Sequence, residues 1–528
     1  MTAADLDTAA RETTARLAAV APELVAPFRA ELPGAAATVG RRLAGALYRE
    51  NIGDARERYA GVGRRHAFDR LEVDKTDDPP ADLLPPGLPG GAGLAVVLTD
   101  AAVNLALARA RPQPAGAGDD PDGRALDHER VAVDGHNLHP CGRTRLGWDT
   151  ADTLRHDVEA GTTTVAFVAV HPDLFVGDHL DLADLYAQAP PGRHVIPVHQ
   201  WQRDTVLRHR YADLYRDGRI RDLDGTIAAA PTAAVRTLLL PPARDGRRRY
   251  LKLSLDIQVT STRRSISTAS TRNGPAISAL LHRLLADEPR VVLLAETAGT
   301  ALSAGRGRDG SAILRDGVDR HLAAGETAIP GGGLTAGDTL DRLVPPGPGN
   351  ALHFVGRYAR LLLPPVISLA ARHGIALEAH LQNCLPTFVD GRPHRIVFRD
   401  FAGLRLYLPR LADADRPPLW PGSVVATDDV DVMRAKLGYT ALQAHLGELV
   451  VRLTRSHDLD EDRAWRAIRE ALDEAYEPLL SDPTSTKAAR ADHAALTAPT
   501  VPHKALVRMR LAGDGDRYVP VQNPLHDP

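Results

Sequence analysis

The sequence of 528 residues contains only two cysteines, Cys141 and Cys384, which lie far apart. This scarcity excludes a disulfide-stabilised scaffold and a zinc site built from thiolates. The net charge is -3, with both signs mixed along the chain, so the sequence lacks the broad basic surface that is typical of nucleic-acid-binding proteins. We therefore expect a protein of the reducing cytoplasm that has no nucleic-acid partner.

Long hydrophobic runs are also missing. The most apolar window, Leu94 to Ala110, is interrupted by Asp100, Asn104 and Arg109, and this pattern predicts no membrane span there. Acidic residues among the first thirty positions break the apolar core that a signal peptide needs. Hydrophobic residues make up 44% and charged residues 25%, which is ordinary for globular proteins. The length predicts two or three domains.

The order of segments predicts where those domains divide. The pattern is mainly helical from residue 3 to about 110, and a Gly/Pro-rich connector covers residues 112–127. Strands and helices then alternate up to about Leu314. A second Gly/Pro-rich segment, residues 325–349, precedes a mixed region that becomes helical after Val430. We expect boundaries near residues 130 and 325.

The first motif with chemical content is VAVDGHNLHPCGRTRLGW, residues 131–148. It places His136 and His139 three residues apart and follows them with Arg143 and Arg145. A metal site, an anion site and a structural turn are all compatible with this pattern. No third ligand of zinc-site spacing lies nearby.

The second motif is YLKLSLDIQVT, residues 250–260. Its strict alternation predicts a strand with one apolar face and one polar face, the latter carrying Lys252 and Thr260. The strand runs into STRRSIS, residues 261–267, so a lysine and Arg264 lie along one path. A point charge and a bidentate guanidinium are suited to a triphosphate; a solvated sheet face is the alternative.

The third motif combines GIALEAHLQNCL, residues 374–385, with the strand RIVFRDFAGLRL, residues 395–406. Alternation predicts that Glu378, His380 and Gln382 share a strand face. A hairpin turn at Asp390-Gly391 would bring Asp400 back beside them. Carboxylate and amide oxygens suit Mg²⁺ better than zinc. A fourth segment, PHKALVRMRL at 502–511, reads on its own as an ordinary amphipathic stretch.

Together these stretches resemble the NRPS-independent siderophore synthetases, the family of the aerobactin synthetases. GHNLHPCGRTRLGW resembles the histidine turn of that family, IPVHQWQ (196–202) its Ile-Pro-x-His-Pro-Trp-Gln motif, and KLSLDIQVTSTRRSIS its nucleotide strand. EAHLQN and RDFAGLRL resemble its palm motifs, and HKALVRMRL resembles its C-terminal Lys-Ala motif. The matches stand in family order over residues 130–511.

The resemblance implies an ATP- and Mg²⁺-dependent ligase. Such an enzyme adenylates a carboxylate, commonly of citrate or a citrate derivative, and passes the acyl group to an amine, hydroxylamine or alcohol. The implied fold is α+β, shaped as a cupped hand: a mainly helical thumb (1–130), β-rich fingers (131–325) and a mixed palm with a helical C-terminus (326–528). The resemblance also implies a homodimer.

The resemblance assigns roles residue by residue. It implies phosphate or nucleotide contacts by His136, Arg143, Arg236, Lys252, Thr260, Arg264, Gln382 and Asn383, and magnesium contacts by Glu378 and Asp400. Arg264, His380 and Lys504 would be catalytic. His380, Lys504 and Arg434 would bind the substrate carboxylates, with Lys436 as the alternative to Arg434. On this view His136 faces the ligand and His139 holds the turn.

The chain departs from the family pattern in three places. Arg143 stands where lysine is usual, Asn137 where proline is common, and Gln200 where the motif has proline. Arginine and lysine are not equivalent at a tight phosphate contact, so the role of Arg143 is open.

Two other function classes have sequence features in their favour. RDFAG and Lys252 on a strand are reminiscent of a small-molecule kinase, but no Gly-rich loop precedes Lys252 and no HRDxxxxN element precedes Asp400. The second is a ferric-siderophore binding or reducing module, because the C-terminal part of the family resembles siderophore-iron reductases. Those proteins use a cysteine cluster, which two distant cysteines cannot supply.

Overall fold

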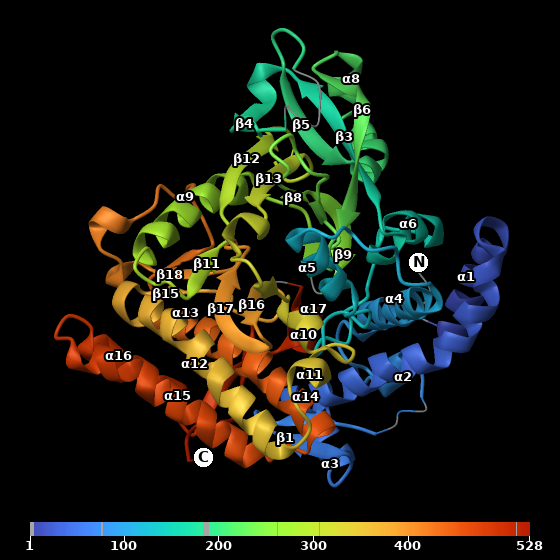
Figure 1. Cartoon of the computed structure of the whole chain (residues 1–528). Helices are drawn as coiled ribbons and strands as arrows, with labels where there is room; N and C mark the ends of the chain where they lie inside the picture. The colour runs from blue at the N-terminus through green and yellow to red at the C-terminus, as the bar shows by residue number, and fades with distance from the viewer. Residues whose placement is uncertain are drawn as a thin grey trace.

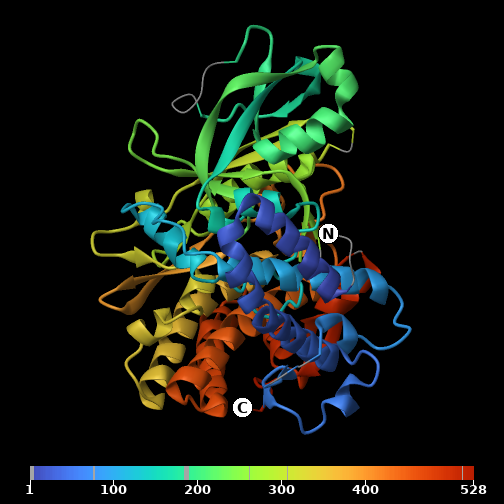
Figure 2. The same ribbon diagram turned by 90° about the vertical axis from the view of Figure 1, so that its right-hand side faces the viewer.

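The computed structural model describes residues 5–527 apart from 75, 77, 183–188, 261, 306 and 514. The N-terminal region is built mainly from three helices, α1, α2 and α4, which pack on one another (Figures 1 and 2). Its elements are α1 (Leu6–Val20), α2 (Val25–Glu50), α3 (Ala55–Arg58), β1 (Arg64–His66), β2 (Arg70–Glu72), α4 (Gly91–Ala110), α5 (Pro121–Arg130) and α6 (Thr150–His156).

The central region is organised by an eight-stranded sheet in which every pairing is antiparallel. In spatial order its strands are β4 (Phe175–Gly177), β12 (Glu296–Leu302), β13 (Ser311–Asp316), β8 (Arg249–Leu253), β7 (Thr237–Leu239), β6 (Ile220–Pro231), β3 (Thr163–Val170) and β5 (His194–His199). A separate hairpin joins β9 (Leu255–Val259) to β10 (Thr262–Arg264). The short helices α7 (Arg208–Arg210) and α8 (Ala212–Arg216) and the longer α9 (Thr268–Leu284) complete the region.

The C-terminal region places helices against small sheets (Figure 1). One sheet has the order β11 (Val291–Leu293), β17 (Arg392–Phe398), β16 (Cys384–Val389), β14 (Thr327–Ala328); another is β15 (Ile375–Ala376), β18 (Arg405–Tyr407), β19 (Ala426–Thr427); a third pairs β20 (Thr500–Lys504) with β21 (Tyr518–Gln522). The helices are α10 (Gly331–Leu334), α11 (Thr339–Leu343), α12 (Pro348–His373), α13 (Val430–Leu437), α14 (Gly447–His457), α15 (Glu461–Ser481), α16 (Thr486–Leu496) and α17 (Leu506–Ala512).

The mixed helix-and-sheet class predicted from the sequence is confirmed, but the predicted boundaries at 130 and 325 stay predictions. Apolar cores cross both positions. Cys141 and Val507 belong to the core of the N-terminal helices, and Ile277 of α9 belongs to the core of the C-terminal region. The Glu50 carboxylate at the end of α2 accepts hydrogen bonds from the backbone N–H groups of Val507 and Arg508, at 2.9 and 2.8 Å.

Two helices, α4 and α12, are long and apolar enough to cross a membrane by length and composition alone. Within their most apolar windows, however, 72% and 78% of the residues are buried inside the protein, as expected of core helices. Asp100 of α4 is buried and accepts a 2.7 Å hydrogen bond from the Arg145 backbone N–H. The polar residues that interrupt α4 in the sequence thus include a tertiary anchor.

Two strand predictions need correction. Residues 250–260 form two strands, because the regular strand is interrupted at Ser254 between β8 and β9. The alternative of a solvated face is wrong for Lys252, which is only 4% exposed. In the first half of the third motif, residues 374–383, the strand covers only Ile375–Ala376, and residues 377–383 form an irregular segment that ends in a turn. The alternation there does not reflect pleating. The Asp390-Gly391 hairpin is confirmed, with both residues at positive φ.

Candidate functional site

A cavity lies where segments from all parts of the chain meet: the histidine loop, the turn after β9 and the 380–382 turn. Its walls include six of the residues predicted to contact the ligand, namely His136, Arg143, Thr260, Arg264, His380 and Gln382. Ser261 of the second motif lies outside the described residues. The cavity therefore gathers residues from positions 129 to 444 of the sequence.

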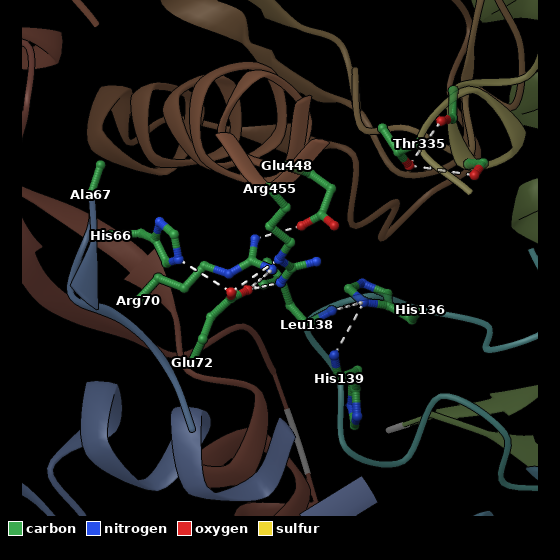
Figure 3. Close-up of polar contacts among 12 residues, drawn as sticks. His66, Ala67, Arg70, Glu72, His136, Leu138, His139, Thr335, Glu448 and Arg455 are labelled. Atoms are coloured by element: carbon green, nitrogen blue, oxygen red, sulfur yellow. Dashed lines mark hydrogen bonds and ion pairs between the residues drawn. The ribbon is translucent and has the colours of Figure 1, made fainter. Parts of the chain in front are cut away.

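The two histidines of the first motif lie differently (Figure 3). The His136 ring is exposed to the cavity, and its Nδ1 accepts hydrogen bonds from the backbone N–H groups of Leu138 and His139, both at 3.2 Å. His139 is buried, and its Nδ1 accepts from the Cys141 N–H at 3.0 Å. The surrounding protein lowers the pKa of both rings, mainly by desolvation, and to about 3 for His139. Both imidazoles are therefore neutral near pH 7.

Arg143 and Arg145 are neutralised by acidic side chains behind the cavity. Arg143 Nη2 lies 2.8 Å from both Glu159 oxygens and 3.3 Å from Asp157, while Arg145 binds both oxygens of Asp157. Burial acts to lower the pKa of Arg143, but Glu159 and Asp157 hold it above the usual value. Arg143 therefore lines the cavity, but the charge of its guanidinium group is already balanced by these carboxylates.

Arg264 is different, because no carboxylate pairs with it among the described residues. Its Nη2 donates to Thr260 Oγ1 at 3.3 Å, and its Nε is buried without a partner in the described part of the chain. Burial, Arg236 and Arg145 lower its pKa to about 9. Arg236 supports this strand by donating to the carbonyl oxygens of Arg264 and Ser265 at 2.9 and 3.2 Å.

Thr260 has a left-handed backbone with φ of 57°. A β-branched residue rarely adopts this conformation, and such strain is concentrated at functional sites. Asp400 is a second residue with a left-handed backbone, at φ of 64°. It lies near Thr260, because its charge acts on both Arg236 and Arg264 and raises their pKa values against the effect of burial.

Lys252 and Asp400 form an ion pair with 2.7 Å between Nζ and Oδ1; the lysine is buried and the aspartate is partly buried. Burial acts to raise the pKa of Asp400, but Lys252 outweighs it and holds the pKa well below the ordinary value. Glu296 lies 3.8 Å from the same Nζ, and both of its oxygens are buried without a hydrogen-bond partner among the described residues. Glu296 is an acidic residue of the site that sequence reasoning missed, because no motif surrounds it.

The turn at 377–383 carries a second network of charges. Glu378 Oε1 accepts from Lys436 Nζ at 3.0 Å, and His380 Nε2 lies 3.9 Å from Glu378 Oε2. Burial acts to raise the pKa of Glu378, but Lys436 and His380 lower it to about 2. Asn383 Nδ2 donates to the Glu378 carbonyl oxygen at 3.2 Å, so this amide holds the turn.

Gly403 of the RDFAG motif closes tightly over Glu378. A Cβ atom at this position would lie 1.9 Å from Glu378 Oε2. The backbone here approaches the carboxylate so closely that only glycine fits. This contact links the two halves of the third motif, as does the 3.0 Å hydrogen bond from the Arg399 N–H to the Asn383 carbonyl oxygen.

Lys504 extends the network towards the C-terminus. Its Nζ lies 2.9 Å from Asp516 Oδ1, and Lys436 Nζ lies 4.0 Å from Asp516 Oδ2. Lys504 is also one of the charges that lower the pKa of His380 and His136. This lysine therefore belongs electrostatically to the same site as the two histidines.

Arg434 is not brought into this set. Its Nε donates to the buried Asp492 at 2.9 Å, and its Nη1 donates to Asp431 at 3.1 Å. It faces a different cavity from the one that His136 lines. Of the two cations that the sequence offered on α13, Lys436 is the one that lies beside Glu378, because residues two apart on a helix point in different directions.

The fit of a nucleotide and of a metal can be judged from these groups. Arg264 and Arg236, which lack carboxylate partners among the described residues, suit an anion. The described residues contain no group of three or more His, Cys, Asp or Glu side chains able to hold a metal ion by themselves. Mg²⁺, however, is usually held by one or two carboxylates together with phosphate oxygens and water, and Glu378 and Asp400 are suitable carboxylates.

Residues 124–336 match the model of the IucA / IucC family, and residues 352–519 match that of the ferric iron reductase FhuF-like transporters. The first match contains the histidine loop and the β8–β10 segment; the second contains Glu378, Asp400 and Lys504. The first match confirms the resemblance to the IucA/IucC family that the motifs predicted.

Three relatives illustrate the range of similarity. An uncharacterised Sinorhizobium fredii protein, y4xN, is 27% identical over 414 residues, covering 72% of this chain and 64% of that protein. The D-ornithine–citrate ligase of Staphylococcus aureus is 25% identical over 76% of this chain and 70% of its own length. The citryl-spermidine/3,4-dihydroxybenzoyl-citryl-spermidine:spermidine ligase of Bacillus anthracis is 27% identical over 75% and 72%.

The fold is shared with solved structures of such proteins. The petrobactin biosynthesis protein AsbB from Bacillus anthracis aligns with a TM-score of 0.81 at 21% identity, covering 96% of this chain and 97% of that one. ATP-bound aerobactin synthetase IucA from Klebsiella pneumoniae aligns with a TM-score of 0.69 at 18% identity, covering 88% and 92%.

Proposed function

We propose that the protein is a siderophore-biosynthesis ligase that uses ATP to activate a carboxylic acid as its acyl adenylate. The acid carboxylate would attack the α-phosphorus of ATP and release pyrophosphate; an amine, hydroxylamine or alcohol would then attack the acyl carbon and release AMP. The observation that carries the proposal is that Arg264, which lines the cavity, and the adjacent Arg236 have no carboxylate partner among the described residues, while the Lys252–Asp400 ion pair lies nearby.

The cations supply what a triphosphate requires. ATP brings about four negative charges, and an arginine without a carboxylate partner gains most from binding such an anion because its charge is unbalanced beforehand. Arg264 meets that condition, and Lys252 adds a point charge on the rigid strand β8. Neutral His136 and the exposed amide of Gln382 offer hydrogen bonds to the uncharged parts of the ligand.

Glu378 and Asp400 are the residues that would hold magnesium. When bound, Mg²⁺ would neutralise phosphate charge and polarise the reacting phosphoryl group. Both carboxylates stay ionised over the whole range in which ATP is fully charged, because lysine neighbours lower the pKa of each. Each therefore keeps its negative charge without needing the metal.

The acid substrate would be a polycarboxylate. Two of the relatives named above are citrate or citryl ligases, and Lys504 and Lys436 form a second group of cations next to His380. Lys504 forms an ion pair with Asp516, and a substrate carboxylate could replace Asp516 as the partner of this lysine. We propose Lys504 as the main contact of the acid.

The nature of the products decides between this function and a small-molecule kinase. Purified protein should be incubated with ATP, Mg²⁺, citrate and hydroxylamine, and the products separated by anion-exchange chromatography. We expect AMP, pyrophosphate and a citryl hydroxamate in equal amounts. Formation of ADP and a phosphorylated acid would instead show that the protein is a kinase and not a ligase.

The FhuF-like match of residues 352–519 raises the question of iron reduction. Iron–sulfur clusters are held by several cysteine thiolates, and this segment contains only Cys384. That thiol is buried, and burial raises its pKa well above the ordinary value. We therefore propose that the C-terminal region contributes carboxylates and lysines to the ligase site and does not reduce iron.

Two further properties belong to the proposal. We propose that the enzyme works in the cytoplasm, where ATP is available, and that it forms a homodimer. Light scattering on the purified protein checks the second point, with a mass of twice the chain as the expected result and the mass of one chain as the result against it.

A further inference from the structure

A second cleft lies beside the histidine loop, between α2, β2 and α14. Figure 3 shows four of its lining residues, Arg70, Glu72, Glu448 and Arg455. We call this cleft the arginine cleft. Five arginines line it: Arg41, Arg42, Arg49, Arg70 and Arg455. None of them belongs to the cavity described above or to the family motifs of the sequence. So many guanidinium groups in one cleft indicate a binding site for an anionic ligand.

The spacing of residues on α2 explains why its arginines face the cleft. Arg42, Gly45 and Arg49 are three and four positions apart and therefore share one face of the helix. Gly45 lets the adjacent strand approach, since a Cβ there would lie 2.7 Å from the carbonyl oxygen of Leu71. The arginines of α2 are thus presented next to those of β2 by close backbone packing.

The acidic side chains of the cleft do not balance these arginines. Glu448 and Glu72 are bound by Arg70, and Arg455 also binds Glu72. Asp134 is held by Arg109 at 2.8 Å, which leaves Arg42 at 4.0 Å from it. The fourth acid, Asp74, is exposed to solvent.

Arg41 and Arg49 have no carboxylate partner among the described residues. Arg41 Nη2 donates to Thr38 Oγ1 at 3.1 Å. Arg49 is 5% exposed; its Nη1 lies 3.1 Å from His503 Nε2, and its buried Nε has no partner in the described part of the chain. An unpaired guanidinium so deeply buried is costly unless an anion joins it.

The neighbour of Arg49 cannot compensate for its charge. His503 Nδ1 lies 2.6 Å from Gln443 Oε1, so this nitrogen donates and Nε2 is left to accept from Arg49. Burial and Arg49 itself hold the pKa of His503 well below the usual value. Burial and Arg70 in turn lower the pKa of Arg49 to about 10. A neutral imidazole thus stands where a carboxylate would be expected.

Asn137 connects the arginine cleft to the cavity, because it lines both. Its Nδ2 is buried and has no hydrogen-bond partner among the described residues. A ligand in the arginine cleft would therefore meet a free amide donor on the side that faces His136. A molecule bound there lies next to the site proposed for acyl transfer.

We propose that the arginine cleft binds a carboxylate group of one of the two molecules to be joined, through Arg41, Arg42 and Arg49. The carboxylate could be a spare one of the acid or that of an amino-acid acceptor. Guanidinium groups match the planar, bidentate geometry of a carboxylate. The assignment of the group to a substrate rests on the proposed function, whereas the binding itself does not.

Isothermal titration calorimetry tests the binding with three probes: citrate, ornithine and putrescine, which is ornithine without its carboxylate. The variants are Arg41→Gln and Arg49→Gln, with Arg29→Gln as the matched control because Arg29 is exposed on the same helix. We expect citrate or ornithine to bind, and each cleft variant to weaken that binding by roughly tenfold or more. The control and the affinity for ATP should stay unchanged within about twofold.

The pattern among probes identifies the source of the carboxylate. An effect on citrate assigns the cleft to the acid, and an effect on ornithine but not putrescine assigns it to the acceptor. If neither carboxylate shows binding that Arg41→Gln weakens while ATP still binds, the cleft is not a carboxylate site. Arg41 is only half-buried, so this variant decides the matter even if Arg49→Gln does not fold.

Pyrophosphate release is measured separately on the wild-type protein. Carboxylate binding that depends on the cleft, without pyrophosphate release under any condition, would refute the ligase function and leave the cleft assignment standing. Pyrophosphate release without such binding would refute the cleft assignment alone.

Discussion

Lys252 of β8 and Asp400, two residues after β17, form an ion pair of 2.7 Å although 148 positions separate them in the sequence. The pair fastens the eight-stranded sheet to the C-terminal region at the point where the charges of the candidate site converge. Glu296 of β12 is the second acidic neighbour of this buried lysine, at 3.8 Å. A site assembled in this way depends on the relative position of two regions of the chain.

Replacing the cations of this site should remove adenylation. We expect Lys252→Ala and Arg264→Ala each to reduce pyrophosphate release by about 10²-fold or more, because each supplies charge to the phosphoryl group in the transition state. Lys252→Ala also removes the ammonium group that contacts Asp400 and the buried Glu296, so a lower melting temperature should accompany it. Circular dichroism at the assay temperature checks that the variants are folded; full activity in a folded Arg264→Ala would contradict its role.

Asp400→Asn should separate charge from shape. The amide fills the same space, and Lys252 keeps Glu296 as a neighbour at 3.8 Å, so we expect the fold to survive with a small change in melting temperature. The Mg²⁺ concentration needed for half-maximal activity should rise at least about tenfold, because one charged oxygen ligand is lost. An unchanged Mg²⁺ dependence would make Asp400 a structural partner of Lys252 only.

Lys504→Ala should affect the acid and not the nucleotide. Since Lys504 lies with Asp516 and Lys436 beside Glu378, we expect the KM for the carboxylic acid to rise by about tenfold or more while the KM for ATP stays within a few-fold. Steady-state kinetics with each substrate varied in turn provide the measurement. The reverse pattern would place Lys504 on the phosphates.

The stability of the protein should fall as the solution becomes acidic. His199 is fully buried, its Nδ1 accepts a hydrogen bond from the Trp201 N–H at 3.2 Å, and burial lowers its pKa to about 3 from 6.5. Below pH 6.5 the imidazole of His199 binds a proton in the unfolded chain, whereas in the folded protein it stays neutral until the pH is close to 3. This one group therefore costs about 2 kcal/mol of unfolding free energy between pH 6.5 and 5, and nothing above that range.

Urea unfolding at pH 7.5 and pH 5 measures this effect. His199→Asn, whose amide oxygen can still accept from Trp201, should show a smaller loss of stability between the two pH values than the wild type does. His394→Asn serves as the control because His394 is exposed on β17. Equal pH dependence in all three proteins would show that His199 titrates normally in the folded state.

Much of the site could be found from local sequence, because its segments carry strong motifs. The Asp390-Gly391 turn specifies a hairpin by its backbone preference alone, and that hairpin returns Arg399 to the Asn383 turn. Relationships of this kind depend on residues close in sequence or on one tight turn.

Other features lie beyond local sequence, because burial is decided by what packs on a segment. Nothing in residues 250–260 reveals that the polar face of that strand would be covered and would hold Lys252 against Glu296. The alternation of apolar and polar residues at 377–383 is typical of a strand, but these residues form an irregular segment against which the Gly403 backbone packs closely. Arg49 and His503, 454 positions apart, carry no signal of their contact at all.

The hydrogen bonds from Val507 and Arg508 to Glu50 have a consequence for biosynthesis. They span 457 and 458 positions, and Val507 fills part of the apolar core of the first helices. On the ribosome, α2 emerges long before α17 does, so the core of the early helices stays incomplete, and Glu50 lacks these two hydrogen bonds, until α17 is translated. Contacts of such long range slow folding and leave apolar surface open to aggregation. Overproduction should therefore benefit from slow translation or from chaperones that shield α2 during that interval.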